Sequence, residues 1–429
     1  MIKRIMATCT LALVSQASLA ANSYFCAAQD IDGDLAKPSP QHVRFATFNA
    51  FLNRNSEGQL ITDLTDPSDQ LNSGSDSADT QIRAVAEIIQ RVRPDVILLN
   101  EFDYDAKAEA VELFQQNFLA QSQNGRNPIH YPYVYLAPSN TGLPSGQDFD
   151  NNGTTDGPGD AFGFGFFPGQ FGMVLLSKYP IAHRHVRTFQ HFLWKDMPGA
   201  LLPDNPDTPE PHDYYSKEAL DVFRLSSKSH WDIPLWIKGQ LVHILAAHPT
   251  PPVFDGPEDR NGARNHDEIR FWADYIKGHR SARYIYDDNG RRGGLRRYSP
   301  FVILGDYNAD INDGDSTNQA IAQLLNHRRI DNRVAPGSIG GWEDSQREGL
   351  MNDLHNGNPA MDTGDFNPNN PGNLRVDYVL PSKYGLNPTC GGVFWPTEKD
   401  DSYYLVNSGF PVVSSDHHLV WLDMKVSRW

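Results

Sequence analysis

The chain has 429 residues, 39% of them hydrophobic, and a formal net charge of −16 at pH 7, so it can bury one large core or two smaller ones. Such an acidic surface repels the phosphate backbone of nucleic acids, which disfavours DNA as a partner without excluding a locally positive groove. The three cysteines form no Cys-x-x-Cys motif, which argues against a zinc knuckle or a cysteine redox centre.

The first twenty residues have the pattern of a signal peptide. Lys3 and Arg4 precede an apolar run over 5–14, and Ser18-Leu19-Ala20 places small residues where a signal peptidase cleaves. The run is too short to cross a bilayer of about 30 Å. We therefore predict cleavage after Ala20 and export of a soluble protein to the periplasm or the medium, with an uncleaved anchor as the alternative.

Two cysteines, Cys26 and Cys390, remain near the ends of the mature chain. In an oxidising compartment they predict either one disulfide, tying an N-terminal segment (21–41) to the body, or two free buried thiols. Residues 42–429 show no internal repeat and no linker, so we predict a single domain there.

Strand and helix patterns alternate along this domain. Residues 43–49 alternate as a strand does, and a helix capped by Asp79 follows, with its apolar residues at helical spacing. The other predicted strands are 96–101, 133–136, 173–177, 241–247, 301–304, 376–380 and 419–426, and the other predicted helices are 106–119 and 265–277. Interleaved strands and helices predict α/β layers. Two stretches, about 138–170 and 190–231, read as long loop insertions, the second as an ordered aromatic flap over a pocket.

Polar or charged residues stand directly at the ends of several apolar strands, in most cases at the C-terminal end. These residues are Asn49, Glu101, His248, Asp306 with Asn308, and Asp416-His417 before the last strand. Any one of them is explained by a turn or a helix cap. As a set they predict polar groups that converge on one pocket from the ends of a rigid sheet.

In residue types, order and spacing this set resembles the endonuclease/exonuclease/phosphatase superfamily, which includes deoxyribonucleases, abasic-site endonucleases, neutral sphingomyelinases and inositol polyphosphate 5-phosphatases. The resemblance covers 43 to about 425. It is carried by Thr47-Phe48-Asn49, Leu98-Leu99-Asn100-Glu101, Ala246-Ala247-His248-Pro249, Gly305-Asp306-Tyr307-Asn308, Arg375-Val376-Asp377-Tyr378 and Ser415-Asp416-His417. It implies a DNase I-like, four-layer α/β sandwich, in which two mixed β-sheets pack between outer helices and the active site lies at one rim.

The resemblance also implies the metal ligands. Glu101 would be the main ligand of a Mg²⁺ or Mn²⁺ ion, helped by Asn49 and Asp416. A divalent cation neutralises the charge that develops on a phosphoester under attack, and Mg²⁺ needs only one or two carboxylates besides water and phosphate oxygens.

The remaining residues of the set would act on the substrate. Asp306 and Asn308 would hold the attacking water and the phosphate. His417, oriented by the carboxylate of Asp377, would activate the nucleophile. His248 would contact the phosphate or protonate the leaving group.

Two departures from the family pattern qualify these roles. Ala50-Phe51 follow Asn49, so the further acid of abasic-site endonucleases is missing, which weakens a DNA-repair function and leaves a second metal site open. His418 directly follows His417. We assign the catalytic role to His417 because it adjoins Asp416, as the family motif requires.

A loop within the first insertion has the composition of a calcium site. Asp148, Asp150, Asn152 and Asp156 match the first half of an EF-hand loop, with Asp160 beyond them and Gly159 at the twelfth position in place of Glu. The loop predicts either a structural Ca²⁺ or a metal-free cluster of turns.

Two basic features have open roles. Lys228 and His230 close the second insertion and either bind the substrate phosphate or face solvent. The arginine-rich stretch 280–297 either recruits an anionic substrate or forms a solvated loop.

Together these features predict a secreted, metal-dependent phosphoesterase that cleaves a phosphomonoester or phosphodiester by in-line attack of an activated water. A small molecule or a lipid head group is favoured over nucleic acid, and we expect a monomer without stable membrane insertion. The alternatives are an extracellular nuclease with the same mechanism, a sphingomyelinase-like lipase, and a non-catalytic binding module on the same scaffold. The sequence shows no amphipathic membrane helix or exposed apolar hairpin to support the lipase.

Overall fold

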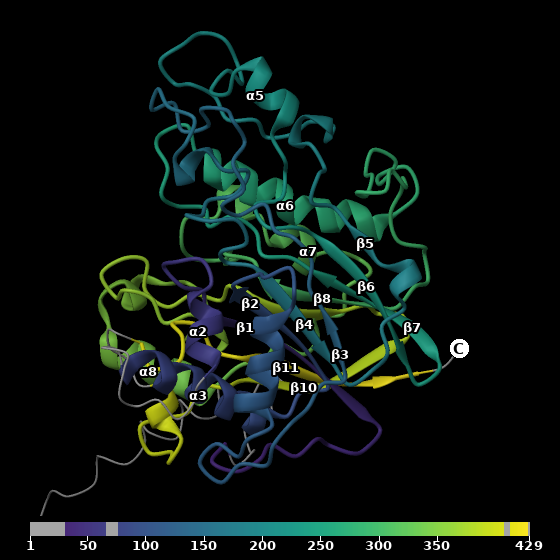
Figure 1. The fold of residues 1–429 in the computed structure, drawn as a ribbon, viewed down its shortest axis with the longest axis vertical. Coiled ribbons are helices and arrows are strands. Elements are labelled where there is room, and N and C mark those ends of the chain that lie inside the picture. Colours follow the sequence, from purple (N-terminus) through teal and green to yellow (C-terminus); the bar gives the residue numbers. More distant parts are fainter. Residues whose placement is uncertain (1–30, 66–75, 407–411, 428–429) are drawn as a thin grey trace, which may run out of the picture.

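The computed structural model describes residues 31–65, 76–406 and 412–427, and its centre is a pair of β-sheets (Figure 1). The strands of the first sheet run in the order β10-β11-β1-β2-β4-β3 and those of the second in the order β5-β6-β7-β8-β9. The strands are β1 (His42–Leu52), β2 (Val96–Phe102), β3 (Tyr133–Tyr135), β4 (Met173–Ser177), β5 (Arg187–Thr188), β6 (Trp231–Ile237), β7 (Gln240–Ala246), β8 (Phe301–Asp306), β9 (Asp377–Pro381), β10 (Leu386–Val393) and β11 (Val420–Val426).

Both sheets are mixed and they pack face to face. β1 pairs in parallel with β2 and antiparallel with β11, while β8 pairs in parallel with β7 and antiparallel with β9. β1 contacts both β8 and β9 across the interface. Successive side chains of a strand point to opposite faces, so Val302 and Leu304 of β8 fill the core between the sheets, while Phe301 and Ile303 pack under the helices.

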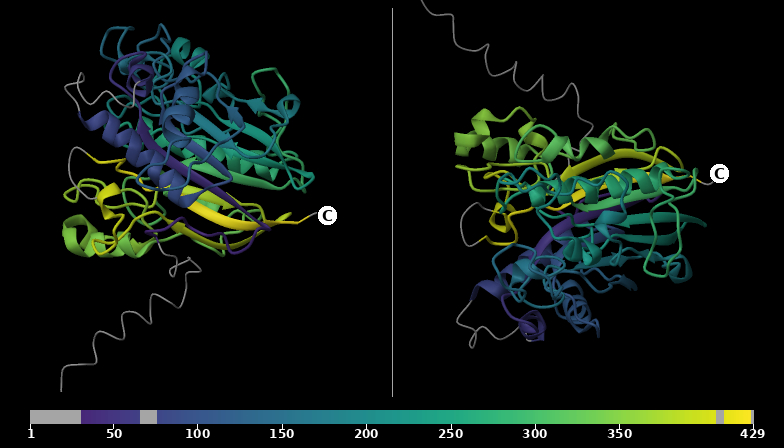
Figure 2. Two further views of the ribbon diagram at one scale, coloured as in Figure 1. Left: turned by 60° about the horizontal axis from the view of Figure 1, so that its bottom comes forward. Right: turned by 90° about the horizontal axis from the view of Figure 1, so that it is seen from above.

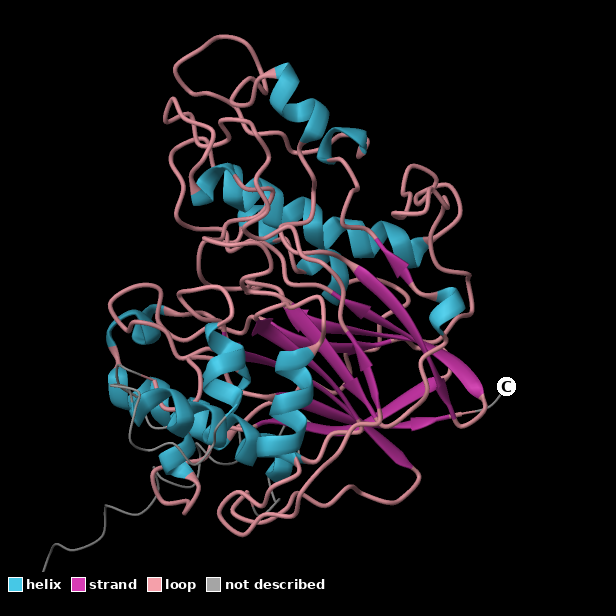
Figure 3. Cartoon of the chain, viewed as in Figure 1, coloured by secondary structure: helices cyan, strands magenta, loops and turns pink. Residues whose placement is uncertain are grey.

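Helices cover the outer faces (Figures 2 and 3). α3 packs its apolar stripe against the first sheet, and α6 packs Ile269, Trp272 and Ile276 against the second. The α-helices are α2 (Gln59–Thr65), α3 (Asp76–Val92), α4 (Glu109–Leu113), α5 (Lys217–Val222), α6 (Arg260–Lys277), α7 (Ala322–Leu325) and α8 (Ile339–Glu348). Short turns are the π-helix η1 (Phe114–Leu119) and the 3₁₀-helices η2 (Pro158–Asp160), η3 (His183–His185), η4 (Trp194–Asp196), η5 (Thr317–Gln319), η6 (Leu350–Leu354), η7 (Pro359–Met361) and η8 (Tyr403–Leu405). The predicted four-layer α/β sandwich is confirmed.

The predicted elements are present with shifted ends, whereas the strands β5, β6 and β10 and the helices α2, α5, α7 and α8 were not predicted. The helix predicted to start at an Asp79 cap begins at Asp76, and the single helix predicted over 106–119 is α4 followed by a π-turn. β6 and β10 were not predicted, because Pro234 and Pro388 interrupt their patterns and proline cannot donate to a strand ladder. Trp231 is a buried residue of β6, so the second insertion ends before it.

The predicted signal peptide and Cys26 lie outside the described residues. Cys390 is disulfide-bonded to a partner that also lies outside them, so its pairing with Cys26 stays a prediction. None of the helices in the described part of the chain combines the length and the apolar character needed to span a bilayer.

Candidate active site

The predicted site residues meet at one rim because of strand direction. β1 and β2 are parallel, so Asn49 and Glu101 lie at the same edge of the first sheet. β7 and β8 are parallel as well, which places His248 beside Asp306 at the matching edge of the second sheet. β9 and β11 run the opposite way, and their first residues therefore reach the same rim: Asp377 is paired directly with Asp306.

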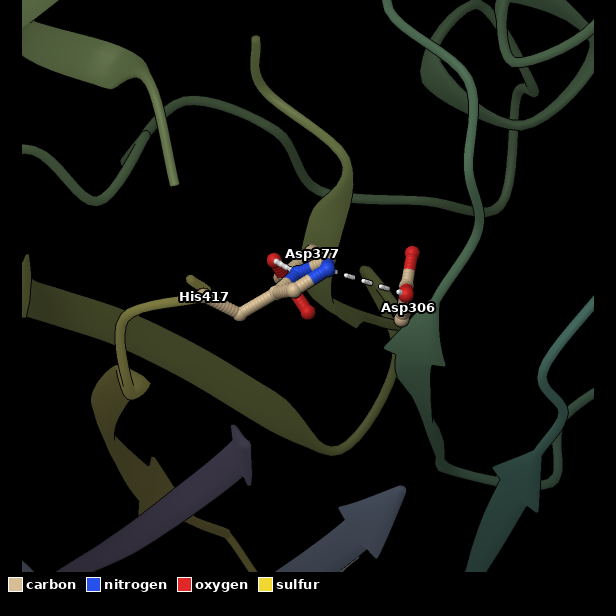
Figure 4. Close-up of side chains that lie close together, drawn as sticks. All are labelled: Asp306, Asp377 and His417. Carbon is tan, nitrogen blue, oxygen red and sulfur yellow. Dashed lines mark hydrogen bonds and ion pairs between the residues drawn. The ribbon is translucent and has the colours of Figure 1, made fainter. Parts of the chain in front are cut away.

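His417 and Asp377 form a buried hydrogen-bonded pair at this rim (Figure 4). Nδ1 of His417 lies 2.8 Å from Oδ2 of Asp377, and the Thr363 hydroxyl donates to the same carboxylate oxygen at 2.9 Å. Burial alone would lower the pKa of His417, but the carboxylates of Asp377, Asp306 and Asp416 outweigh it and raise that pKa well above its usual value. The pair therefore fixes the orientation of the imidazole and favours its charged form.

Asp306 is the point on which the other polar groups converge. Its Oδ2 lies 3.7 Å from Nε2 of His417, 3.4 Å from Nε2 of His248 and 3.1 Å from Nδ2 of Asn49. Its Oδ1 accepts a hydrogen bond from the backbone N–H of Asn308, whose left-handed backbone (φ +50°) closes an Asx-turn. Burial raises the pKa of Asp306 to about 6, opposed by the charge of His417.

Glu101 sits at a bend in the backbone beside Asp306. Its φ of +57° is in the left-handed region, next to a shift in register between β1 and β2. Such a conformation costs about 1–3 kcal/mol and is retained where the surrounding structure imposes it, as at many functional sites. The side-chain amides of Asn49 and Asn53 donate to its two carboxylate oxygens, at 3.1 and 2.8 Å. Burial, followed by repulsion from Asp416, raises the pKa of Glu101 to about 7.

This donor set fits a hard divalent cation. Asp416 and Asp306 lie near enough to Glu101 for their charges to raise its pKa, and carboxylate oxygens are the ligands that Mg²⁺ and Mn²⁺ prefer. Asn49 turns its amide nitrogen toward both Glu101 and Asp306, so in this structure it positions the two carboxylates, and its role as a ligand stays a prediction. Ligand atoms of Asp306, Asp377 and His417 also lie within 4.8 Å of one another, but the hydrogen bond between the last two accounts for that grouping.

A cavity of about 530 Å³ opens over these groups. Its floor includes Glu101, Asp306, Asn308 and His417, and one wall carries His248 and Lys228. The two insertions predicted from the sequence also line this cavity, through Phe149, Gly159, Phe164, Tyr215 and Phe223. The structure thus brings the loops 138–170 and 190–231 over the site, and such a position was predicted for the second loop. The arginine-rich stretch 280–297 contributes no residue to the lining of this cavity.

Lys228 is a buried cation that faces this cavity. Its side chain is 7% exposed, and among the described residues its ammonium group has no hydrogen-bond or ion-pair partner. Burial lowers its pKa, although the charges of Glu268, Glu101 and Asp306 oppose that shift. An unpaired buried ammonium is unfavourable unless a ligand supplies the missing anion.

Two residues of α6 position this wall, and sequence reasoning missed both. The buried carboxylate of Glu268 accepts hydrogen bonds at 2.7 Å from the N–H groups of Ser227 and Thr250, next to Lys228 and His248. The Asn265 amide donates to the carbonyls of Thr250 and Tyr307, which ties together the loops after β7 and β8. The sequence feature that could have revealed Asn265 and Glu268 is their spacing: they are two polar residues, three positions apart, on the helix face that packs against a sheet.

His230, predicted as a substrate-binding residue, does not reach the cavity. Its ring nitrogens are hydrogen-bonded to the Ser226 hydroxyl (2.7 Å) and the Glu268 carbonyl (2.9 Å), and its ring packs against Phe271 and Trp272. Burial lowers the pKa of His230 to about 4. The residue has a structural role at the start of β6.

This buried histidine makes stability depend on pH. Because the pKa of His230 is about 4 when folded and 6.5 ordinarily, the unfolded chain binds the extra proton between these values, and the free energy of unfolding falls as pH falls through that window. We expect His230 to contribute up to about 3 kcal/mol of this dependence. Urea unfolding between pH 7.5 and 4.5 should show a flatter pH dependence for His230→Phe than for wild type. The exposed His130 provides the control variant His130→Phe, and equal slopes for all three proteins would contradict the expectation.

The neighbouring His418 points away from the site. Its ring stacks on Trp395 with 3.8 Å between ring centroids, and burial lowers its pKa to about 3. This geometry favours His417 over His418 as the functional histidine.

The predicted calcium loop is only partly assembled. Carboxylate oxygens of Asp148, Asp150 and the buried Asp160 lie within 4.8 Å of one another, whereas the carboxylate of Asp156 does not join this group. Backbone N–H groups donate to Asp148 and Asp160, as in a metal-free turn cluster. Both predicted alternatives therefore remain, and a calcium-dependent rise in melting temperature that Asp150→Ala removes would decide for the ion.

The fold and the rim residues together define a class: a DNase I-like sandwich with buried carboxylates and a His–Asp pair at one sheet edge. The sequence agrees, because residues 46–417 match the Endonuclease/Exonuclease/phosphatase family, and the chain belongs to this family. No curated relative matches the sequence.

Solved structures similar to the chain span almost its full length at low identity. A family member from Beutenbergia cavernae is 15% identical, with 90% of this chain and 72% of that chain covered and a TM-score of 0.44. Sphingomyelinase C from Streptomyces griseocarneus is 15% identical (90% and 99% covered, TM-score 0.44), and truncated TDP2 from Caenorhabditis elegans is 12% identical (90% and 98% covered, TM-score 0.40).

Proposed function

We propose that this protein is an exported phosphoesterase that uses Mg²⁺ or Mn²⁺ to hydrolyse a phosphomonoester or phosphodiester by in-line attack of water. The observation that carries the proposal is the convergence on Asp306. One carboxylate oxygen of Asp306 lies within 3.7 Å of His417, His248 and Asn49, beside Glu101 and in the lining of the cavity. Membership of the Endonuclease/Exonuclease/phosphatase family supports the same reaction class.

Each side of the site has its own task in this reaction. Glu101 and Asp416, with Asn49 beside them, would hold the cation, which when bound acts as a Lewis acid on the phosphate and orients it. Water in contact with Oδ2 of Asp306 and Nε2 of His417, atoms 3.7 Å apart, would lose its proton to the Asp306 carboxylate, while the charged imidazole of His417 would hold the water and stabilise the negative charge that develops. Asp377 keeps that imidazole charged and oriented, and Asn308 holds the backbone of this corner in place.

Lys228 and His248 would bind the phosphate oxygens from the opposite side. Replacing Lys228 by Met removes the charge and keeps most of the volume, so we expect inorganic phosphate to inhibit the variant about 10-fold less strongly than wild type, because a charge-assisted hydrogen bond is lost. The measurement is the competitive inhibition constant for phosphate, with Lys238→Met as control, because Lys238 does not line the cavity. Unchanged inhibition in a folded Lys228→Met protein would remove Lys228 from the site.

The export and the oligomeric state belong to the proposal as well. Residues 1–20 support export with cleavage after Ala20, and an exported chain that begins at Ala21 would establish it. We propose a monomer, which sedimentation of the purified chain would test.

The substrate panel that tests the proposal combines bis-p-nitrophenyl phosphate, p-nitrophenyl phosphate, plasmid DNA and sphingomyelin, each with Mg²⁺ and with Mn²⁺. The proposal predicts cleavage of at least one small phosphoester. Cleavage of the plasmid alone would favour a nuclease, and binding of phosphate without any hydrolysis would favour a binding module.

A further inference from the structure

We infer that the substrate is a small soluble phosphoester that carries one flat apolar or aromatic group, and that the two insertions form the subsite for this group. The inference rests on the proposed function, because it takes the polar end of the cavity as the place of the phosphate. It adds which chemical group lies at the other end.

The cavity has two chemically different ends. The floor residues and Lys228 supply charge, whereas the insertion wall is built from Phe149, Phe164, Tyr215 and Phe223. Both ends line the same space of about 530 Å³, so a phosphate bound at the floor places its ester group against the rings. Pockets of about 300–1,000 Å³ enclose most of the surface of a small organic ligand.

The aromatic wall is held together by its own packing. Phe149 lies 4.4 Å from Phe223 between ring centroids, and Phe223 lies 4.7 Å from Tyr215. The buried Arg264 of α6 donates hydrogen bonds to the carbonyls of Phe162, Arg224 and Leu225, which fastens both insertions to the scaffold. A rigid aromatic surface loses little conformational freedom on binding, so it favours a flat partner that packs on its rings.

The charge of the molecule argues for a soluble substrate. Two of the rings that line the cavity are exposed at its mouth: Phe164 is 56% and Phe254 is 87% exposed. These rings either cover a bound ligand or contact a bilayer. The net charge of −16 opposes approach to anionic lipid surfaces and to DNA. We therefore assign the rings to a single small molecule.

Benzylphosphonate and methylphosphonate, which share the phosphate-like group and differ in the ring, test this assignment. Calorimetric binding to the full mature chain with Mn²⁺ should show benzylphosphonate binding at least 10-fold more tightly than methylphosphonate. The ring should account for the difference, because aromatic contacts and buried apolar area add to the affinity. Phe164→Ala should reduce this ratio about 3- to 5-fold, and the milder Phe223→Leu should reduce it in a variant that keeps the buried packing.

Tyr298→Ala is the matched control, since Tyr298 is 58% exposed and does not line the cavity. Equal affinity for the two phosphonates, or equal loss in the control, would overturn the inference. A different result would also overturn the inference: wild type binds sphingomyelin vesicles, and Phe164→Ala and Phe254→Ala abolish that binding. The exposed rings at the mouth of the cavity would then be a membrane-binding surface. The two phosphonates report binding and not turnover, so this test is independent of hydrolysis. If the protein binds benzylphosphonate more tightly but hydrolyses no phosphoester, the aromatic subsite is supported and the proposed function is contradicted.

Discussion

Glu101→Gln is expected to lower kcat/KM for phosphoester hydrolysis by about 10³-fold or more, since it removes the negative charge that would hold the cation at the phosphate. The side-chain amide keeps the shape of the residue and one of its two oxygens, so one of the two hydrogen bonds donated by Asn49 and Asn53 is kept. The fold should therefore survive, which thermal melting and near-ultraviolet circular dichroism can check.

The exposed Glu112 of α4 provides the control variant Glu112→Gln, which should leave hydrolysis unchanged. A folded Glu101→Gln protein that keeps metal-dependent activity near the wild-type value would remove Glu101 from the role of main ligand.

His417→Ala is the second change with a large expected effect, a loss of about 10²- to 10⁴-fold in kcat. The imidazole lies 2.8 Å from Asp377 and 3.7 Å from Asp306, so its removal leaves the water without one of the groups that hold it and leaves the buried Asp377 carboxylate without its ion-pair partner. Asp377→Asn should lower kcat less, because the asparagine still holds the ring but no longer stabilises its charge.

The double variant tests whether the two residues act as a unit. If they do, His417→Ala with Asp377→Asn should be little slower than His417→Ala alone, because groups that act together show non-additive effects. The exposed His130→Ala serves as the control. Effects that multiply across the pair would show that His417 and Asp377 act independently.

Much of the site could be predicted because its chemistry lies at strand ends. Strand periodicity fixes which residue ends each strand, and the parallel pairs β1/β2 and β7/β8 then carry Asn49, Glu101, His248 and Asp306 to one rim. Residues whose role depends on how a helix docks carried no such signal. Glu268 and Asn265 look like ordinary helix residues until α6 is placed over the loops that they hold.

The sequence also does not reveal which way a loop residue turns, and this explains the errors in the predictions for the loops. His230 lies two residues from Lys228 in the sequence, yet the chain turns its ring into the packing beside Phe271 while Lys228 faces the cavity. The aromatic wall was predicted only as a flap, because insertions without periodicity do not reveal which rings face inward. Arg264, which fastens that wall through three backbone carbonyls, reads in the sequence as one more surface charge.

The measurement that tests the account most directly is the hydrolysis of bis-p-nitrophenyl phosphate by the purified mature chain, before and after metal removal. We predict that EDTA abolishes the activity of the wild-type protein and that added Mg²⁺ or Mn²⁺ restores it. Neither ion should restore activity in the Glu101→Gln protein. Hydrolysis that persists after complete metal removal, or that Glu101→Gln performs as well as wild type, would contradict a cation-dependent phosphoesterase site at this rim.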